Sequence, residues 1–439
     1  VWQRMKIDLA YGQIGLNVDL PDSARPTIIR KPSVPVPASP EAVVAKAMAS
    51  PIGSGTLAEI AQGRKSACIL ICDITRPVPN GLFLQPMVRT LLAAGIPASA
   101  ITILVATGLH RPNEGEELSE LVGDQWVLDT IKTVNHFAQN DDDHIDMGVT
   151  ATRQTPVKLD RRFVEAEVRI ATGLVEPHFM AGYSGGRKVV APGVAHQDTI
   201  RRFHSAEFME DPGAVQCNLD GNPLHEEQLE IIRMLGDVHA LNVVLDDDRN
   251  LVHATFGEII ESHLGAVAFA RTFTEVPVGQ RFKTLVTSAA GYPLDQTYYQ
   301  TVKGMVTPLD ILEPGGTLII ASECTEGLGS EDYRRAQARL VSLGPEAFLN
   351  SLLAKSAADI DEWQTEMQLK PMRVGSILLY SDKLPAADDA ITGVTRIDDI
   401  AKAVAESIAK SGDPSVAVIP EGPYVVPKFS PAGSASEPV

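Results

Sequence analysis

Short apolar runs that end in polar or glycine-rich residues recur along the first half of the chain. Residues 67–73, 101–106 and 168–175 each have the composition of one buried strand. Runs that are apolar throughout are typical of parallel strands covered on both faces. We therefore expect a parallel sheet with polar loops after the carboxyl ends of its strands, where open α/β sheets bind their ligands.

The rest of the chain continues this alternation of helices and strands. We expect helices near 84–94, 226–235, 258–273, 331–342 and 397–411, and further strands near 240–246, 284–289, 317–322, 375–381 and 415–419. Residues 21–52 are rich in Pro, Ser and Ala and are predicted to run irregularly over the surface. The sequence thus predicts two α/β domains with largely parallel sheets: an N-terminal cofactor-binding domain at 1–275 and a C-terminal domain at 276–439 with a flexible end from residue 430.

Composition and charge narrow the class of protein. The chain has 439 residues, of which 44% are hydrophobic and 21% charged, as in ordinary globular proteins, and its net charge is −18. So acidic a chain is not expected to bind nucleic acid or anionic membranes, because both require a basic surface. The four cysteines form no CxxC pair, no stretch reaches transmembrane length and no signal peptide is evident, so we expect a cytoplasmic protein without a disulfide framework.

The most unusual segment is residues 173–188, which has the sequence GLVEPHFMAGYSGGRK and begins within the third apolar run. Its glycines would let backbone amides approach an anion, and Ser184, Arg187 and Lys188 would add donors and positive charge. The GxGxxG and GxxxxGK[ST] fingerprints of nucleotide-binding loops are absent from it. We interpret the segment as the cradle of a phosphate-bearing cofactor, since packing alone would not call for this combination of residues.

Three histidines stand in or near such loops. His178 lies inside the glycine-rich segment, His110 follows the second apolar run, and His204 lies at the expected end of a helix that starts near Gln197. Because histidine titrates near neutral pH, His110 and His178 are candidate acid–base groups, although a hydrogen-bonded loop histidine fits the setting of His110 equally well. His204 taken alone would be structural, because a metal role needs partners that sequence cannot place.

Other polar residues offer contacts for an anionic substrate. Arg76, in the loop after the first apolar run, could hold a carboxylate or phosphate while Asp73 orients a hydroxyl; an Asp–Arg pair that only stabilises the loop is the alternative. Gln300 and Lys303 are three residues apart and would share one face of a helix, either to bind an anionic substrate or to face solvent. Trp363 could line a pocket or belong to the core.

Taken together, these motifs resemble the lactate racemase family, whose members carry a nickel-pincer nucleotide. The resemblance covers nearly the whole chain, and its combination of motifs in this order is highly specific. The motifs are DxTRPVP from Asp73, VATGxHRP from Val105, the segment from His178 to Lys188 with Pro192-Gly193, HSxEF from His204, GYPLDQ from Gly291, YQxxKG from Tyr299 and WQ at Trp363.

The resemblance implies a role for each candidate residue. Lys188 would attach covalently to the nickel-pincer nucleotide, and His204 would be the protein ligand to nickel in an approximately planar site that the cofactor completes. His110 and His178 would be the acid–base pair, and the active site would lie in a cleft between the two domains. The remaining residues would contact the cofactor (Asp73, Ile74, Thr75, Arg76, Ser184, Gly185 and Gly186) or the substrate (Arg76, Tyr299, Gln300, Lys303 and Trp363).

The activity implied is inversion of C2 in a 2-hydroxy carboxylic acid. The hydrogen at C2 is poorly acidic, so its removal as hydride, assisted by deprotonation of the hydroxyl, avoids a carbanion. Two bases on opposite sides would serve the two mirror-image substrates. Family members act on several 2-hydroxy acids, including sugar acids. Pro177 departs from the small polar residue that the family commonly has beside the histidine, so we expect substrate contacts to differ there.

Two other interpretations remain open at this point. An NAD-dependent 2-hydroxyacid dehydrogenase would act on the same substrates, but the chain lacks its GxGxxG fingerprint. A protein that holds the cofactor without turnover would need neither two histidines nor a carboxylate clamp. For the racemase, the expected partners are the small-molecule substrate and the proteins that synthesise the cofactor.

Overall fold

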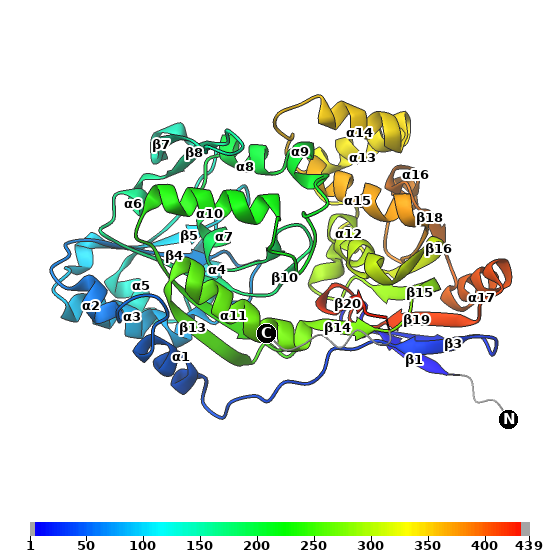
Figure 1. Ribbon diagram of the computed structural model, residues 1–439, viewed down its shortest axis with the longest axis horizontal. Coiled ribbons are helices and arrows are strands. Elements are labelled where there is room, and N and C mark those ends of the chain that lie inside the picture. Colours follow the sequence, from blue (N-terminus) through cyan, green and yellow to red (C-terminus); the bar gives the residue numbers. More distant parts are fainter. Residues whose placement is uncertain (1–4, 432–439) are drawn as a thin grey trace. The chain divides into compact units, whose positions relative to one another are not determined.

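The computed structural model describes residues 5–431, which form two compact units (Figure 1). The N-terminal unit comprises residues 33–204 and 211–273. The C-terminal unit comprises residues 205–210 and the described parts of 1–32 and 274–439. The division at 274 falls next to the expected boundary. The first 32 residues and the segment 205–210, however, belong to the C-terminal unit, whereas the sequence suggested the N-terminal one. Of the predicted flexible end, residues 432–439 lie outside the described part of the chain.

A six-stranded sheet organises the N-terminal unit. From edge to edge its strands are β13 (Leu251–Glu258), β12 (His239–Leu245), β9 (Val168–Leu174), β4 (Ala67–Cys72), β5 (Ile101–Ala106) and β6 (Lys132–Asn135). All neighbours pair in parallel except β12 and β13, which are antiparallel. The three apolar runs singled out in the sequence are therefore adjacent strands, and the prediction of a largely parallel sheet is confirmed.

Helices bury the apolar strands of this sheet. Helix α3 (Leu84–Ala93) buries Leu84, Met87, Val88 and Leu91, which recur every three or four residues and join the core formed by β4 and β5. The other helices of the unit are α1 (Pro40–Ala49), α2 (Leu57–Ala61), α4 (Gly115–Val122), α5 (Gln125–Thr130), α6 (Arg161–Val164), α7 (Arg187–Val190), α8 (Gln197–Phe203), α10 (Pro223–Leu235) and α11 (Ile259–Thr274). Two antiparallel pairs complete it: β7 (His144–Val149) with β8 (Pro156–Asp160), and β10 (Pro177–His178) with β11 (Gly182–Tyr183).

The C-terminal unit has its own six-stranded sheet, which is parallel throughout. Its order is β18 (Thr395–Ile397), β17 (Ser376–Tyr380), β16 (Leu312–Ala321), β15 (Phe282–Ser288), β19 (Ser415–Ile419) and β3 (Arg25–Ile28). Two short strand pairs belong to the same unit: β1 (Lys6–Leu9) with β2 (Leu16–Asp19), and β14 (Glu275–Val278) with β20 (Val426–Phe429).

The prediction of mostly irregular structure at residues 21–52 was wrong for two parts of this segment. Strand β3 lies in this segment and forms the edge of the C-terminal sheet, and helix α1 lies there as well. β3 has only four residues and none of them is buried, so an apolar pattern could not reveal it. The N-terminus of helix α1 could have been predicted from the sequence. Ser39 is the N-cap residue, whose hydroxyl oxygen accepts the amide of Ala42, and Pro40 follows at the first helical position.

The helices of the C-terminal unit are α12 (Tyr298–Val306), α13 (Glu331–Leu343), α14 (Pro345–Leu353), α15 (Glu362–Val374), α16 (Asp389–Thr392) and α17 (Ile400–Ser411), together with the short α9 (Ala206–Met209). Segment 205–210 belongs here because Ala206 of α9 is buried against Leu340, Phe348 and Leu369. Across residues 5–431, no helix combines the length and the apolarity needed to span a bilayer.

The strand order of the N-terminal unit gathers the loops that carry the candidate chemistry. β9, β4 and β5 are consecutive neighbours and run in the same direction. The segments that leave their carboxyl ends begin at Val175, Asp73 and Thr107, so they start along one edge of the sheet. This is the edge at which open α/β sheets bind ligands.

Candidate active site

Asp73 and His110 lie in the segments that follow the neighbouring strands β4 and β5, and their side chains contact each other. His110 Nδ1 lies 2.6 Å from Asp73 Oδ2, and the other carboxylate oxygen accepts the Thr75 hydroxyl at 2.5 Å. The Asp73 side chain is 6% exposed, whereas that of His110 is 63% exposed. A buried carboxylate thus orients a histidine whose ring remains accessible, which is a common arrangement for a catalytic base.

The carboxylate of Asp73 is ionised at neutral pH. Burial by itself raises the pKa of Asp73, but the hydrogen bonds from His110 and Thr75 and the nearby charge of Arg76 outweigh it and hold that pKa below its usual value. An ionised carboxylate only accepts hydrogen bonds, so the proton between the two groups belongs to His110 Nδ1.

Arg76 does not form the loop-stabilising pair with Asp73 that was one of the alternatives for it. Its guanidinium instead pairs with Glu176 at 2.6 Å. Glu176 lies in the segment after β9, so this ion pair joins the loops of two adjacent strands. In the same loop as Arg76, the amide of Ile74 donates to the side chain of Asn113 at 3.2 Å. Glu176 was not among the candidate residues, although its place directly before Pro177 and His178 was a usable signal.

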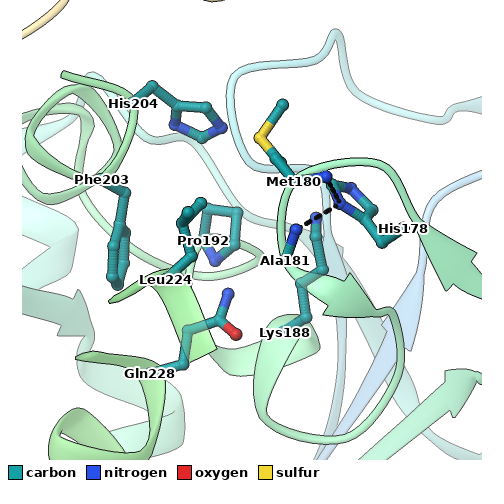
Figure 2. A pocket seen from close by; sticks show the side chains of 9 residues that line it. All are labelled: His178, Met180, Ala181, Lys188, Pro192, Phe203, His204, Leu224 and Gln228. Atoms are coloured by element: carbon teal, nitrogen blue, oxygen red, sulfur yellow. Dashed lines mark hydrogen bonds between the residues drawn. The ribbon is translucent and has the colours of Figure 1, made fainter. Parts of the chain in front are cut away.

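His178 is held by the backbone of its own hairpin. It ends β10, and its Nδ1 accepts hydrogen bonds from the amides of Met180 at 3.4 Å and Ala181 at 3.2 Å (Figure 2). The hairpin between β10 and β11 therefore fixes the ring through the nitrogen nearer the backbone.

Ser184, Gly185 and Gly186 have packing roles that the sequence analysis did not foresee. The Ser184 hydroxyl donates to the carbonyl of Leu174 at 2.7 Å. Gly185 has φ of +86°, and a Cβ on it would lie 2.5 Å from Val175. Gly186 has φ of +43°, so a side chain there would be strained as well. Packing alone thus accounts for both glycines, and their contact with a cofactor stays a prediction.

The structure gives Arg187 a role other than the expected anion contact. Its side chain is fully buried and donates to His225 Nδ1 at 2.7 Å. It also donates to the carbonyls of Ala181 and Tyr183, at 3.2 Å and 3.1 Å, and lies 2.9 Å from His263 Nε2. The buried Arg187 side chain therefore stabilises the hairpin that contains His178 through hydrogen bonds to its backbone carbonyls.

Lys188 and His204 line one pocket with His178. Figure 2 shows Lys188 on α7 and His204 at the end of α8 turned toward the same space, with Gln228 of α10 at its edge. The complete lining is His178, Met180, Ala181, Lys188, Pro192, Phe203, His204, Leu224 and Gln228. No sequence pattern distinguishes Gln228, because it lies in an ordinary amphipathic helix.

Burial gives Lys188 and His204 reactive forms at neutral pH. Burial lowers the pKa of Lys188 to about 8, helped by the positive charges of Arg76 and Arg187, so a neutral and nucleophilic amine is accessible. Burial also lowers the pKa of His204 to about 4, which leaves its ring neutral. His204 Nδ1 donates to the carbonyl of Ile200 at 2.8 Å, so the lone pair is on Nε2. As the sequence suggested, His204 ends the helix that starts at Gln197.

Three further histidines form a cluster that the sequence analysis did not expect. His136 Nε2 lies 3.0 Å from His144 Nε2, and the ring of His196 meets that of His144 edge-on with centroids 5.0 Å apart. Thr107, three residues before His110, donates to the carbonyl of His136 at 2.7 Å. The cluster thus supports the His110 loop, and His196 also caps α8, the helix that ends at His204.

The expected substrate residues of the C-terminal unit lie together on two of its helices. Gln300 and Lys303 lie on α12, as expected, and Gln300 Oε1 is buried without a hydrogen-bond partner among residues 5–431. Trp363, on α15, donates its indole N–H to the Tyr299 hydroxyl at 3.2 Å. A buried amide oxygen without a partner is costly and is common where a ligand binds.

The chain is similar over nearly its whole length to known proteins of one family. Residues 11–216 match the family model for the lactate racemase N-terminal domain, and residues 280–426 match that for the lactate racemase C-terminal domain. The lactate racemase of Thermoanaerobacterium thermosaccharolyticum is 31% identical over 96% of this chain and 98% of its own. That of Lactiplantibacillus plantarum is 31% identical over 89% of this chain and 91% of its own.

Solved structures show the same relationship. The lactate racemase apoprotein from Thermoanaerobacterium thermosaccharolyticum superposes with a TM-score of 0.88 at 29% identity and covers 97% of this chain and 100% of that one. A Thermotoga maritima protein shares the fold, with a TM-score of 0.67 at 16% identity. Both halves of the chain match the two family models, and relatives of nearly the same length are named racemases, so the chain belongs to the lactate racemase family of isomerases.

Proposed function

We propose that this protein inverts C2 of a 2-hydroxy carboxylic acid, lactate-like or larger and including sugar acids, by proton-coupled hydride transfer with a nickel-pincer nucleotide. The observation that carries the proposal is one pocket lined by Lys188, His204 and His178, with the charges of Arg76 and Asp73 close enough to Lys188 to influence its pKa. The names of the relatives support a racemase of 2-hydroxy acids, and this pocket supports the finer mechanism.

The chemistry of the pocket fits such a cofactor. Lys188 offers an amine for covalent attachment, and His204 offers Nε2 as a single imidazole ligand. Residues 5–431 contain no cluster of three His, Cys, Asp or Glu side chains that could hold a metal, so nickel bound through His204 would need its other ligands from the cofactor. When bound, the nucleotide supplies a hydride acceptor for the poorly acidic C2 hydrogen.

The protein residues handle the proton and the charge of the substrate. We assign His110 and His178 to proton transfer at the substrate hydroxyl, with Asp73 stabilising the charge on His110 after it accepts a proton. Arg76, Gln300 and Lys303 are assigned to the substrate carboxylate, and Tyr299 and Trp363 to other contacts with the substrate. Ile74, Thr75, Ser184, Gly185 and Gly186 are assigned to the cofactor.

A substrate screen tests the proposal. Protein produced together with the cofactor-synthesis proteins would be incubated with single enantiomers of lactate, of larger 2-hydroxy acids and of aldonates, and the products separated by chiral chromatography. We expect the mirror image or C2 epimer to form from at least one of these without added NAD. Loaded protein that converts none of them, or that only oxidises them when NAD is added, would contradict the proposal.

A further inference from the structure

His110 and His178, which we assign to proton transfer, are held through the same ring atom, Nδ1, by groups of opposite kind. His110 Nδ1 faces Asp73, a carboxylate that only accepts hydrogen bonds, at 2.6 Å. The proton between them must lie on His110 Nδ1. A neutral imidazole has one proton, so His110 Nε2 carries a lone pair.

His178 has the reverse arrangement. The amides of Met180 and Ala181 point at its Nδ1, and backbone amides only donate. His178 Nδ1 must therefore carry the lone pair, and the proton of the neutral ring lies on Nε2. Figure 2 shows both hydrogen bonds, which come from consecutive residues of the turn between β10 and β11.

We infer that the resting protein holds His110 and His178 in opposite tautomers, so that His110 is the base and His178 a hydrogen-bond donor until its ring is released. This inference rests on the proposed function for its catalytic meaning. The proton of a substrate hydroxyl would pass to His110 Nε2, and the resulting imidazolium would stay paired with Asp73.

His178 cannot act as a base at Nε2 in this position. That would require a proton on Nδ1, which would face the two amide hydrogens of Met180 and Ala181. The doubly protonated ring would meet the same obstacle. His178 must therefore turn its ring or separate from the turn before it exchanges a proton through Nε2. From the resting form, only a hydroxyl that faces His110 can thus lose its proton. Inversion also needs a proton transfer on the opposite face, so turnover of either enantiomer is completed only after His178 moves.

Nuclear magnetic resonance of the histidine rings tests the inference without any turnover. Apoprotein labelled with ¹⁵N in its ten histidines would be studied by long-range ¹H–¹⁵N correlation at neutral pH, a method that distinguishes protonated from unprotonated ring nitrogens. The signals of the two rings are assigned by their loss in His110→Gln and His178→Gln. If His178→Gln does not fold, His178→Asn replaces it, because the asparagine oxygen can still accept hydrogen bonds from the amides of Met180 and Ala181. We expect the Nδ1–H form for His110 and the Nε2–H form for His178.

Asp73→Asn is the matched control. It should shift His110 away from a pure Nδ1–H form and leave the His178 signals unchanged, because Asp73 contacts only the first ring. The same tautomer for both histidines, or two ring protons on His178, would overturn the inference. The spectra need neither cofactor nor substrate, so a failed racemisation assay would contradict the proposed function and leave this result standing.

Discussion

The buried histidine cluster makes the N-terminal unit sensitive to acid. Burial, reinforced by neighbouring His144, lowers the pKa of His136 to about 3, whereas an unfolded histidine has a pKa of about 6.5. Between these values the unfolded chain binds a proton that the folded protein excludes, so stability is complete above about pH 6.5 and is lost as the pH falls toward 3. From pH 7 to about pH 4.5 this one group costs about 2 to 3 kcal/mol.

Replacing His136 with Gln removes the titrating ring and leaves an amide that can still donate to His144. Calorimetric melting of wild type and His136→Gln at both pH values measures the effect. At about 2 to 4 °C per kcal/mol, the wild type should lose roughly 5 to 10 °C more than the variant on acidification. His253→Gln is the control, because that ring is only partly buried on Phe269 and should contribute less. Equal losses for wild type and His136→Gln would refute the reasoning.

Three further predictions concern the pocket and the substrate. Lys188→Ala removes the attaching amine, so mass spectrometry of protein made with the cofactor-synthesis proteins should show no covalent increment; an unchanged increment would contradict the assignment. His204→Ala should lose nickel because a ligand is removed, while His110→Ala and His178→Ala should lose turnover and keep the metal; equal nickel loss in all three would contradict this division of roles. Lys303→Ala should raise KM for every 2-hydroxy acid by about tenfold or more, as expected for a lost charged hydrogen bond; an unchanged KM would place the carboxylate elsewhere.

The sheet of the N-terminal unit could be predicted because buried parallel strands have an unmistakable pattern. β4, β5 and β9 are apolar almost throughout, and their loops differ sharply in polarity. Strand β3 could not be predicted, because its four residues pair at a sheet edge that is far away in sequence. The union of the first 32 residues with the C-terminal unit depends on that pairing, so it could not be predicted either.

Within the candidate site, the sequence indicated candidate residues but not their contacts. The sequence analysis placed Asp73 and His110 after two apolar strands but predicted no contact between them, because that contact depends on the pairing of the two strands in the sheet. Arg187 shows what the sequence could not predict. Its charge and its glycine neighbours indicated an anion site, but its side chain points into the core and donates to His225. The direction of a side chain on a four-residue helix such as α7 depends on tertiary packing that no local pattern records.

The fate of the C2 hydrogen tests the central claim most directly. In the proposed mechanism this hydrogen leaves as hydride and returns to the same carbon without exchanging with water. A substrate identified in the screen and deuterated at C2 should therefore give product that keeps most of the label in ordinary water, as measured by mass spectrometry during the first turnovers. Extensive loss of the label in those turnovers would contradict the account, because a proton held on His110 or His178 exchanges rapidly with solvent.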